Sequence, residues 1–147
     1  MTGPGAHASI WHQILLGSLV LGLCAVVHIM VLVIGLQALE AVDELARGPP
    51  VPIERVIMIA SAFGFVLLGH TLQVWIWAIS FYLKGSIATI NDAVYFALVT
   101  TTTLGYGDIT LPRGHRIFGA MGAVSGLLTF GLSTAFLVSL MEAILKV

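Results

Sequence analysis

Six consecutive residues, Thr103-Leu104-Gly105-Tyr106-Gly107-Asp108, combine the groups that could bind a cation stripped of water. Ordered backbone carbonyls can replace the hydration shell of a permeating ion, and a threonine hydroxyl can add to them. To aim successive carbonyls at one axis, the backbone must enter conformations that are costly for a residue with a Cβ atom. Gly105 and Gly107 enter those conformations freely. An ordinary turn is the other interpretation of Gly-Tyr-Gly-Asp, and the segments around it decide between the two.

The composition is that of a membrane protein. The chain has 147 residues, of which 59% are hydrophobic and 9% are charged, whereas soluble domains carry about a quarter charged residues. The length allows one compact domain. The formal net charge of −1 gives no reason to expect nucleic acid as a partner. Cys24 is the only cysteine, so no intrachain disulfide can form, and in its apolar surroundings it is expected to act as a small hydrophobe.

Three uncharged segments are long enough to span a bilayer as helices, which takes roughly 20 residues. The first apolar segment is too long for the core of a signal peptide, so it is expected to be a retained membrane helix. Between the first two, acids, arginines and Pro49, Pro50 and Pro52 predict a stiff polar linker. The predicted spans are Ile14–Leu36, Val56–Leu83 and Ile117–Met141, with residues 1–40 as the N-terminal helix region and 41–55 as the linker.

A shorter apolar segment, Thr89 to Thr102, precedes the hexapeptide. It is too short to span a bilayer, so it predicts a re-entrant helix. Thr89 is a good N-cap, and Asp92 at the third helical position suits the positive helix end. The non-helical backbone of residues 103–108 is tolerated at membrane depth only when it is buried in protein or lines an aqueous path. One such loop cannot surround an axis alone, which predicts a symmetric assembly.

From about Val56 to Met141 the chain resembles a prokaryotic potassium channel of the two-helix-plus-pore-loop family. Val94 to Thr103 is similar to the pore helix of that family, and Gly126 to Ala135 is similar to its inner-helix core. The predicted N-terminal span is one transmembrane helix more than that family has. Together with this span, the resemblance implies an all-α membrane protein with three transmembrane helices, a re-entrant pore helix and a selectivity-filter loop, assembled as a homotetramer. It divides the pore domain, residues 56–147, into an outer helix (56–83), a pore helix (about 89–102), the filter (103–108) and an inner helix (116–145).

The function that the resemblance implies is passive, potassium-selective conduction through the filter at a four-fold axis. Potassium ions would be coordinated at Thr103, Leu104, Gly105 and Tyr106, while Gly107 supplies flexibility at the outer mouth. K⁺ would be the permeant ion, and no cofactor is expected. Two alternatives stay open: a weakly selective cation channel, and a non-conducting subunit of a larger channel. An enzyme is not expected, because the spans carry no paired carboxylates and no nucleophile beside a base.

The resemblance also implies residues that support the filter. The Tyr106 side chain is expected to pack against Tyr95 and Phe96, with Val99 behind the filter where some relatives carry Glu. Leu104 stands where Val or Ile is commoner. Asp108 at the outer mouth is either a cation attractor or a hydrogen-bond acceptor that fixes the loop.

The inner helix places several residues on one face by their spacing of three or four. By resemblance, Gly126 matches a gating hinge, and the face lines the cavity at Leu127, Phe130, Thr134 and Val138. Glu142 either contributes to a ring of carboxylates at the inner mouth or forms a local pair with Lys146. The small residues Gly119, Gly122 and Gly126 are expected to pack against the second span. The hydroxyls of Thr101 and Thr102 either face the cavity or cap the pore helix.

The expected location is the cell membrane, as a multi-pass protein with the N-terminus outside and the C-terminus in the cytoplasm. The two arginines of the linker, Arg47 and Arg55, agree with positive-inside counting, whereas Lys84, Arg113 and Arg116 disagree with it.

Two histidines, His28 and His70, lie inside predicted spans, where polar residues are functional candidates. Antiparallel helices would bring them to a similar depth, with Gln73 one turn from His70. A hydrogen-bonded tie between helices, a proton-sensing gate built on His70, and two separately satisfied neutral histidines all stay open. The first two spans contain no arginine ladder, so a voltage sensor of the usual kind is not expected.

Overall fold

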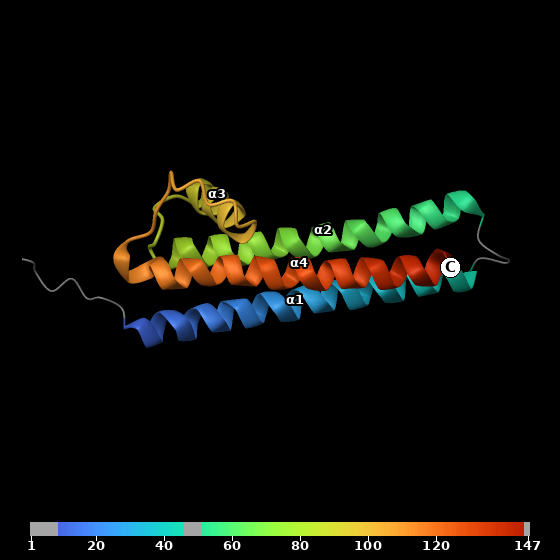
Figure 1. Cartoon of the computed structure of the whole chain (residues 1–147), viewed down its shortest axis with the longest axis horizontal. Helices are drawn as coiled ribbons and strands as arrows, with labels where there is room; N and C mark the ends of the chain where they lie inside the picture. The colour runs from blue at the N-terminus through green and yellow to red at the C-terminus, as the bar shows by residue number, and fades with distance from the viewer. Residues whose placement is uncertain (1–8, 46–50, 146–147) are drawn as a thin grey trace, which may run out of the picture.

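The computed structural model describes residues 9–45 and 51–145, and all regular structure in these ranges is helical. Three long helices lie lengthwise side by side, and a short helix lies near one end of them (Figure 1). The elements are α1 (Ile10–Leu45), α2 (Pro52–Leu83), α3 (Ile90–Thr101), a 3-10 turn (Arg113–His115) and α4 (Arg116–Leu145).

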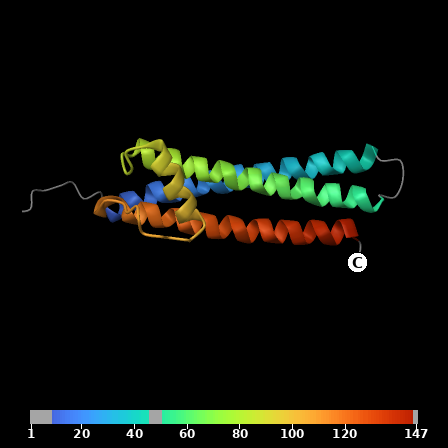
Figure 2. The same cartoon turned by 90° about the horizontal axis from the view of Figure 1, so that it is seen from above.

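The three long helices are each long and apolar enough to cross a membrane, which confirms the predicted all-α membrane fold. α1 and α4 run in the same direction and α2 runs opposite to both (Figures 1 and 2). Consequently the start of α1, the end of α2 and the start of α4 lie at the same end as α3. Both α1 and α3 contact α2 and α4, so α2 and α4 form the shared frame.

The predicted polar linker is wrong in its extent, because helix covers most of residues 41–55. α1 continues to Leu45 and α2 already begins at Pro52. Proline suits this first helical position because its missing N–H would have no intrahelical partner there. The Glu54 carboxylate accepts a hydrogen bond of 2.9 Å from the backbone N–H of Val51 and so closes the helix start. Arg47 lies outside the described residues.

The ends of α2 and α3 follow local rules. Gly85 adopts a left-handed φ of 67° after α2, and the N–H groups of Gly85 and Ser86 bond to the carbonyls of Tyr82 and Phe81. The Thr89 hydroxyl accepts a hydrogen bond of 3.1 Å from the Asp92 N–H, which confirms Thr89 as the N-cap of α3. The observed ends of α3 and α4 fall within a residue of the predicted ones.

Aromatic side chains fill the interior near α3. Trp77 and Phe81 of α2 are completely buried, and Phe118 of α4 is 2% exposed. The ring of Phe118 lies 5.3 Å from that of Trp77 and 5.5 Å from that of Phe81. Inside a bilayer, lipid tails are as apolar as leucine, so close packing rather than water exclusion stabilises such contacts. This cluster is the support on which α3 rests.

The glycine face of α4 packs mainly on α3 and the loop after it, not on the second span as predicted. A Cβ atom on Gly119 would meet Leu111 and Phe96, and one on Gly122 would meet Thr100 before it met Trp77. The missing side chains therefore let the re-entrant helix approach α4 closely.

Candidate functional site

Residues 103–108, the predicted filter, follow the end of α3. They form a non-helical, exposed segment near one end of the molecule (Figure 2). Among the described residues with positive φ, three alternate along this segment: Thr103 at 61°, Gly105 at 58° and Gly107 at 79°. Leu104 and Tyr106, between them, keep negative φ. A left-handed φ is strained for a β-branched residue such as Thr103, and strain of this kind gathers at functional sites.

Backbone hydrogen bonds fasten the start of this segment to the end of α3. The Thr103 N–H donates to the Thr100 carbonyl over 3.0 Å, and the Gly105 N–H donates to the Val99 carbonyl over 3.1 Å. Val99 is 8% exposed, and its carbonyl contacts the segment through the bond to Gly105. Its contribution is its main chain as well as its side chain.

The hydroxyls of Thr101 and Thr102 bond within α3. Thr101 Oγ1 donates to the Ala97 carbonyl over 2.8 Å, and Thr102 Oγ1 donates to the Leu98 carbonyl over 2.7 Å. Each hydroxyl is therefore bonded to the carbonyl four residues before it at the end of the helix, and the Leu98 carbonyl also accepts the Thr102 N–H. Of the two roles predicted for these threonines, the structure has the capping one.

Asp108 is held by two hydrogen bonds. The Tyr95 hydroxyl donates to Asp108 Oδ2 over 2.6 Å, and the Ile109 N–H donates to Asp108 Oδ1 over 3.0 Å. The Tyr95 hydrogen bond lowers the pKa of the Asp108 carboxyl and raises the pKa of Tyr95 itself, because it favours the charged acid and the neutral phenol. These are the bonds that a loop-fixing role of Asp108 requires.

The other aromatic contacts differ from the predicted arrangement. Phe96 packs its ring edge-on against Phe81, with ring centroids 5.0 Å apart. Tyr106 is 67% exposed and forms no ring contact with Tyr95 or Phe96 among the described residues of this one chain. Tyr95 instead uses its hydroxyl on Asp108. Within a single chain, therefore, the phenol of Tyr106 faces outward.

The predicted cavity face of α4 is exposed in the single chain. Leu127 is 66% exposed, Phe130 43% and Val138 51%, and Thr134 and Glu142 are exposed on the same face. Lys146, the alternative partner of Glu142, lies outside the described residues. Gly126 lies in an uninterrupted helix, where it is buried against α3.

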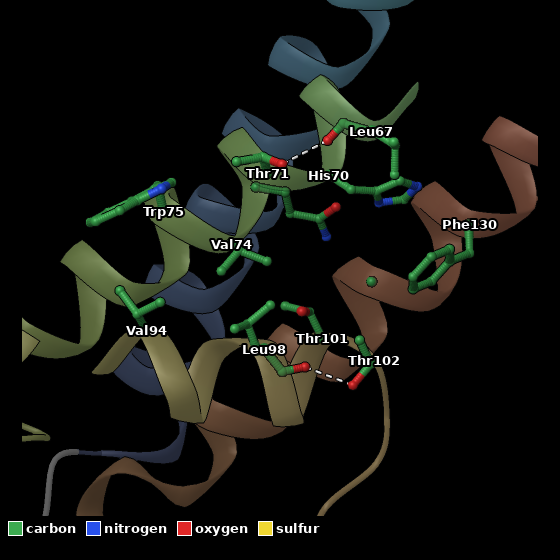
Figure 3. Close-up of a pocket in the computed structure, with 12 residues that line it drawn as sticks. Leu67, His70, Thr71, Val74, Trp75, Val94, Leu98, Thr101, Thr102 and Phe130 are labelled. Atoms are coloured by element: carbon green, nitrogen blue, oxygen red, sulfur yellow. Dashed lines mark hydrogen bonds between the residues drawn. The ribbon is translucent and has the colours of Figure 1, made fainter. Parts of the chain in front are cut away.

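A cavity of about 280 Å³ lies between α2, α3 and α4. Figure 3 shows Thr101, Thr102 and Leu98 of α3 on one side of it and His70 and Phe130 on the other. His70 stacks on Phe130 with ring centroids 4.4 Å apart. The cavity thus lies between the end of α3 and the face of α4 that contains Phe130.

The rings of His28 and His70 lie against each other, with centroids 4.7 Å apart. This agrees with the similar depth predicted for them. The tie between them runs through a residue that sequence reasoning missed. Ser133 Oγ lies 2.8 Å from His28 Nε2 and 3.1 Å from His70 Nε2. One serine of α4 therefore links α1 and α2 at membrane depth.

Gln73 hydrogen-bonds His70 within α2, and its bonds to another helix have partners that were not predicted. It bonds to two residues of α4, Ser125 and Thr129. Ser125, Thr129 and Ser133 are each at most 4% exposed. Their spacing of four places them on one helical face, and this spacing of hydroxyls was the available signal for the missed residues.

Comparisons with known proteins find a family model and several curated relatives. The family model described as "Ion channel" matches residues 55–143. The A-type voltage-gated potassium channel KCND3 of Rattus norvegicus is 39% identical over 88 residues, and its counterparts in Oryctolagus cuniculus and Homo sapiens match equally. These matches cover 54% of this chain but only 13% of each relative. No solved structure matches the chain.

The matched segment runs from the start of α2 through α3, the glycine-containing loop and most of α4. It contains every residue that sequence reasoning assigned to ion coordination. Because the family model covers more than half of the chain, the protein belongs to the ion channel family.

Proposed function

We propose that this protein is a potassium-selective channel, in which K⁺ passes down its gradient through the segment Thr103–Gly107. The observation that carries the proposal is the alternation of φ at Thr103, Gly105 and Gly107. In an extended strand with negative φ throughout, successive carbonyls point to opposite sides. When the sign of φ alternates, successive peptide groups turn the same way, and their carbonyls can face one axis.

Carbonyls that face one axis are the groups that replace the water shell of K⁺ in potassium channels. We infer ion sites at Thr103, Leu104, Gly105 and Tyr106, with the Thr103 hydroxyl at the inner end. Leu104 is 55% exposed and takes part through its carbonyl, so its departure from Val or Ile leaves the coordinating atoms unchanged. The KCND3 relatives, which are named as potassium channels, support the same ion.

The channel is a homotetramer in this proposal, because one carbonyl row supplies only one side of an ion site. The exposed face of α4 that contains Leu127, Phe130 and Val138 would line the shared cavity. Thr134 lies on the same face. Exposed intramembrane surface of this kind suits a helix that faces other copies across an axis. Glu142 would lie at the inner mouth.

The proposed orientation in the cell membrane places the N-terminus outside and the C-terminus in the cytoplasm. The start of α1 lies at the end of the molecule that carries the filter loop, and the end of α4 lies at the other. An outward-facing filter mouth would give this orientation. Labelling of single cysteines introduced at Ser9 and Leu145 from each side of sealed vesicles tests it.

The function is tested with purified protein in liposomes, by reversal potentials while K⁺ is exchanged for Na⁺. Reversal potentials that follow the K⁺ gradient support the proposal. Gly105→Ala should abolish this selectivity, because its φ of 58° is unfavourable for a residue with a Cβ atom. Gly22→Ala is the matched control, since no atom lies within 4 Å of the added methyl group.

Two other outcomes would contradict the proposal. Equal permeability to Na⁺ and K⁺ identifies a weakly selective cation channel. An assembled protein without any flux identifies a non-conducting subunit.

A further inference from the structure

A buried amide clamps α2 to α4 directly behind the end of the pore helix. Gln73 Nε2 donates to Ser125 Oγ over 3.0 Å, and Thr129 Oγ1 donates to Gln73 Oε1 over 2.7 Å. Gln73, Ser125 and Thr129 are 2%, 1% and 4% exposed. The side-chain amide thus uses both its donor and its acceptor on one neighbouring helix, as a buried polar group must.

The two contacts lie one helical turn apart, on either side of Gly126. Ser125 immediately precedes Gly126, and Thr129 follows it by three residues. Two hydrogen bonds to one rigid amide fix both the rotation and the height of this turn relative to α2.

The turn held in this way is the one on which α3 rests. A Cβ atom added to Gly126 would lie 1.9 Å from the carbonyl oxygen of Thr101 and 2.7 Å from its carbonyl carbon. No real Cβ atom approaches a backbone that closely, so the main chain of α3 would have to move. The backbone of Thr101 therefore rests directly on the main chain of α4.

Thr101 is two residues from the first predicted ion site. Its side chain is turned back onto Ala97, and the chain then passes through Thr102 into Thr103 with its left-handed φ of 61°. The N–H of Thr103 bonds to the Thr100 carbonyl. A shift of the Thr101 backbone would thus be transmitted to the Thr103 carbonyl with no flexible residue between them.

We propose that Gln73 is a positioning residue for the filter: through Ser125, Thr129 and Gly126 it sets the place of the Thr103 carbonyl. The inference rests on the proposed function, because it assigns Gln73 a part in K⁺ selectivity. It differs from a purely structural role of the clamp, which would affect how much channel assembles but not which ion the assembled channel passes.

The test compares Thr129→Val, which is nearly isosteric but lacks the hydroxyl, with Thr129→Ser, which keeps it. Gln73→Leu removes the amide from the other side of the same contacts. Thr71→Val is the matched control, because Thr71 is an exposed threonine of α2 that bonds only to its own helix. Only tetramers isolated by size are reconstituted, and the K⁺-to-Na⁺ permeability ratio is read from reversal potentials.

We expect Thr129→Val and Gln73→Leu to lower the ratio about five-fold or more, the factor that one net hydrogen bond corresponds to. Thr129→Ser and Thr71→Val should keep the wild-type ratio. Thr129→Val combined with Gln73→Leu should lower it no further than Gln73→Leu alone, since Gln73→Leu already removes the bond that Thr129→Val removes.

An unchanged ratio in assembled Thr129→Val channels would overturn the inference even if their yield fell. The Thr129 pair decides alone if Gln73→Leu does not assemble, and Thr129→Val should fold because only one hydroxyl is lost. A wild-type channel without K⁺ selectivity would instead contradict the proposed function, so the two failures are distinguishable.

Discussion

The Tyr95 hydroxyl donates a 2.6 Å hydrogen bond to the carboxylate of Asp108, which joins α3 to the far end of the predicted filter. Both residues are exposed in the single chain. The bond spans the whole segment Thr103–Gly107, whose other end is fastened through Thr100 and Val99. Val99 has no carboxylate, and among the described residues the side-chain tie to Asp108 comes from Tyr95.

Tyr95→Phe should destabilise the outer end of the filter without affecting the fold. The variant keeps the ring and loses only the hydroxyl that Asp108 accepts. We expect K⁺ currents that decay faster during maintained activity, measured in lipid bilayers. Tyr82→Phe is the matched control, since Tyr82 is an exposed tyrosine of α2 at 46% exposure. Equal decay in both variants would contradict the bracing role.

The same bond has a defined dependence on pH. The folded pKa of Asp108 lies below its ordinary value of 3.8, so its contribution to stability is present above that pH and is lost on further acidification. The pKa of Tyr95 lies above its ordinary value of 10.0, so its contribution is present below that pH and is lost on further alkalisation. Between these limits the bond should be independent of pH.

Carboxyl carbon NMR of the protein in detergent checks this dependence. The Asp108 titration should have a lower midpoint in the wild type than in Tyr95→Phe. Identical midpoints would show that Tyr95 does not stabilise the charged carboxylate.

Gly126→Ala should strongly destabilise the assembled protein, because the new methyl group would overlap the Thr101 carbonyl. Overpacking of this kind costs typically 1–3 kcal/mol, occasionally more. Gly22→Ala should instead be neutral or stabilising, since glycine within a helix costs roughly 0.5–1 kcal/mol relative to alanine. The midpoint of thermal unfolding in detergent measures both. A Gly126→Ala protein as stable as the Gly22→Ala protein would contradict the close contact between α3 and α4.

Ser133→Ala should loosen α1 from the rest of the molecule. It removes the hydroxyl shared by His28 and His70 and leaves completely buried His28 without that partner. An orphaned buried polar group costs about 1–3 kcal/mol. Ser139→Ala is the control, because Ser139 is an exposed serine of the same helix.

Amide hydrogen exchange measures the effect of Ser133→Ala on α1. Protection of α1 around His28 should fall in Ser133→Ala and stay unchanged in Ser139→Ala. Equal protection in the two variants would mean that the histidines are satisfied separately.

Much of the fold follows from local features of the sequence. Long uncharged segments predict spans because a bilayer satisfies no backbone polar group, and the three helices were predicted on that basis. Thr89 and Asp92 predict the start of α3 because the cap bond forms between neighbours in the chain. Gly105 and Gly107 indicate positive φ because glycine lacks a Cβ atom, and both have it. The helical parts of residues 41–55 were not predicted. Charged residues and prolines there indicated a linker, whereas α1 continues to Leu45 and Pro52 is the first residue of α2.

The contacts between helices could not be predicted in this way. His28 and His70 were expected at one depth, but depth does not say that Ser133 lies between them. Gln73 shares a depth with several residues, and its choice of Ser125 and Thr129 depends on how α2 and α4 are rotated about their axes. Gly126 packs on Thr101 only because α3 turns back into the bundle. Periodicity along one helix reports which residues share a face, and only the packing of several helices shows what that face meets.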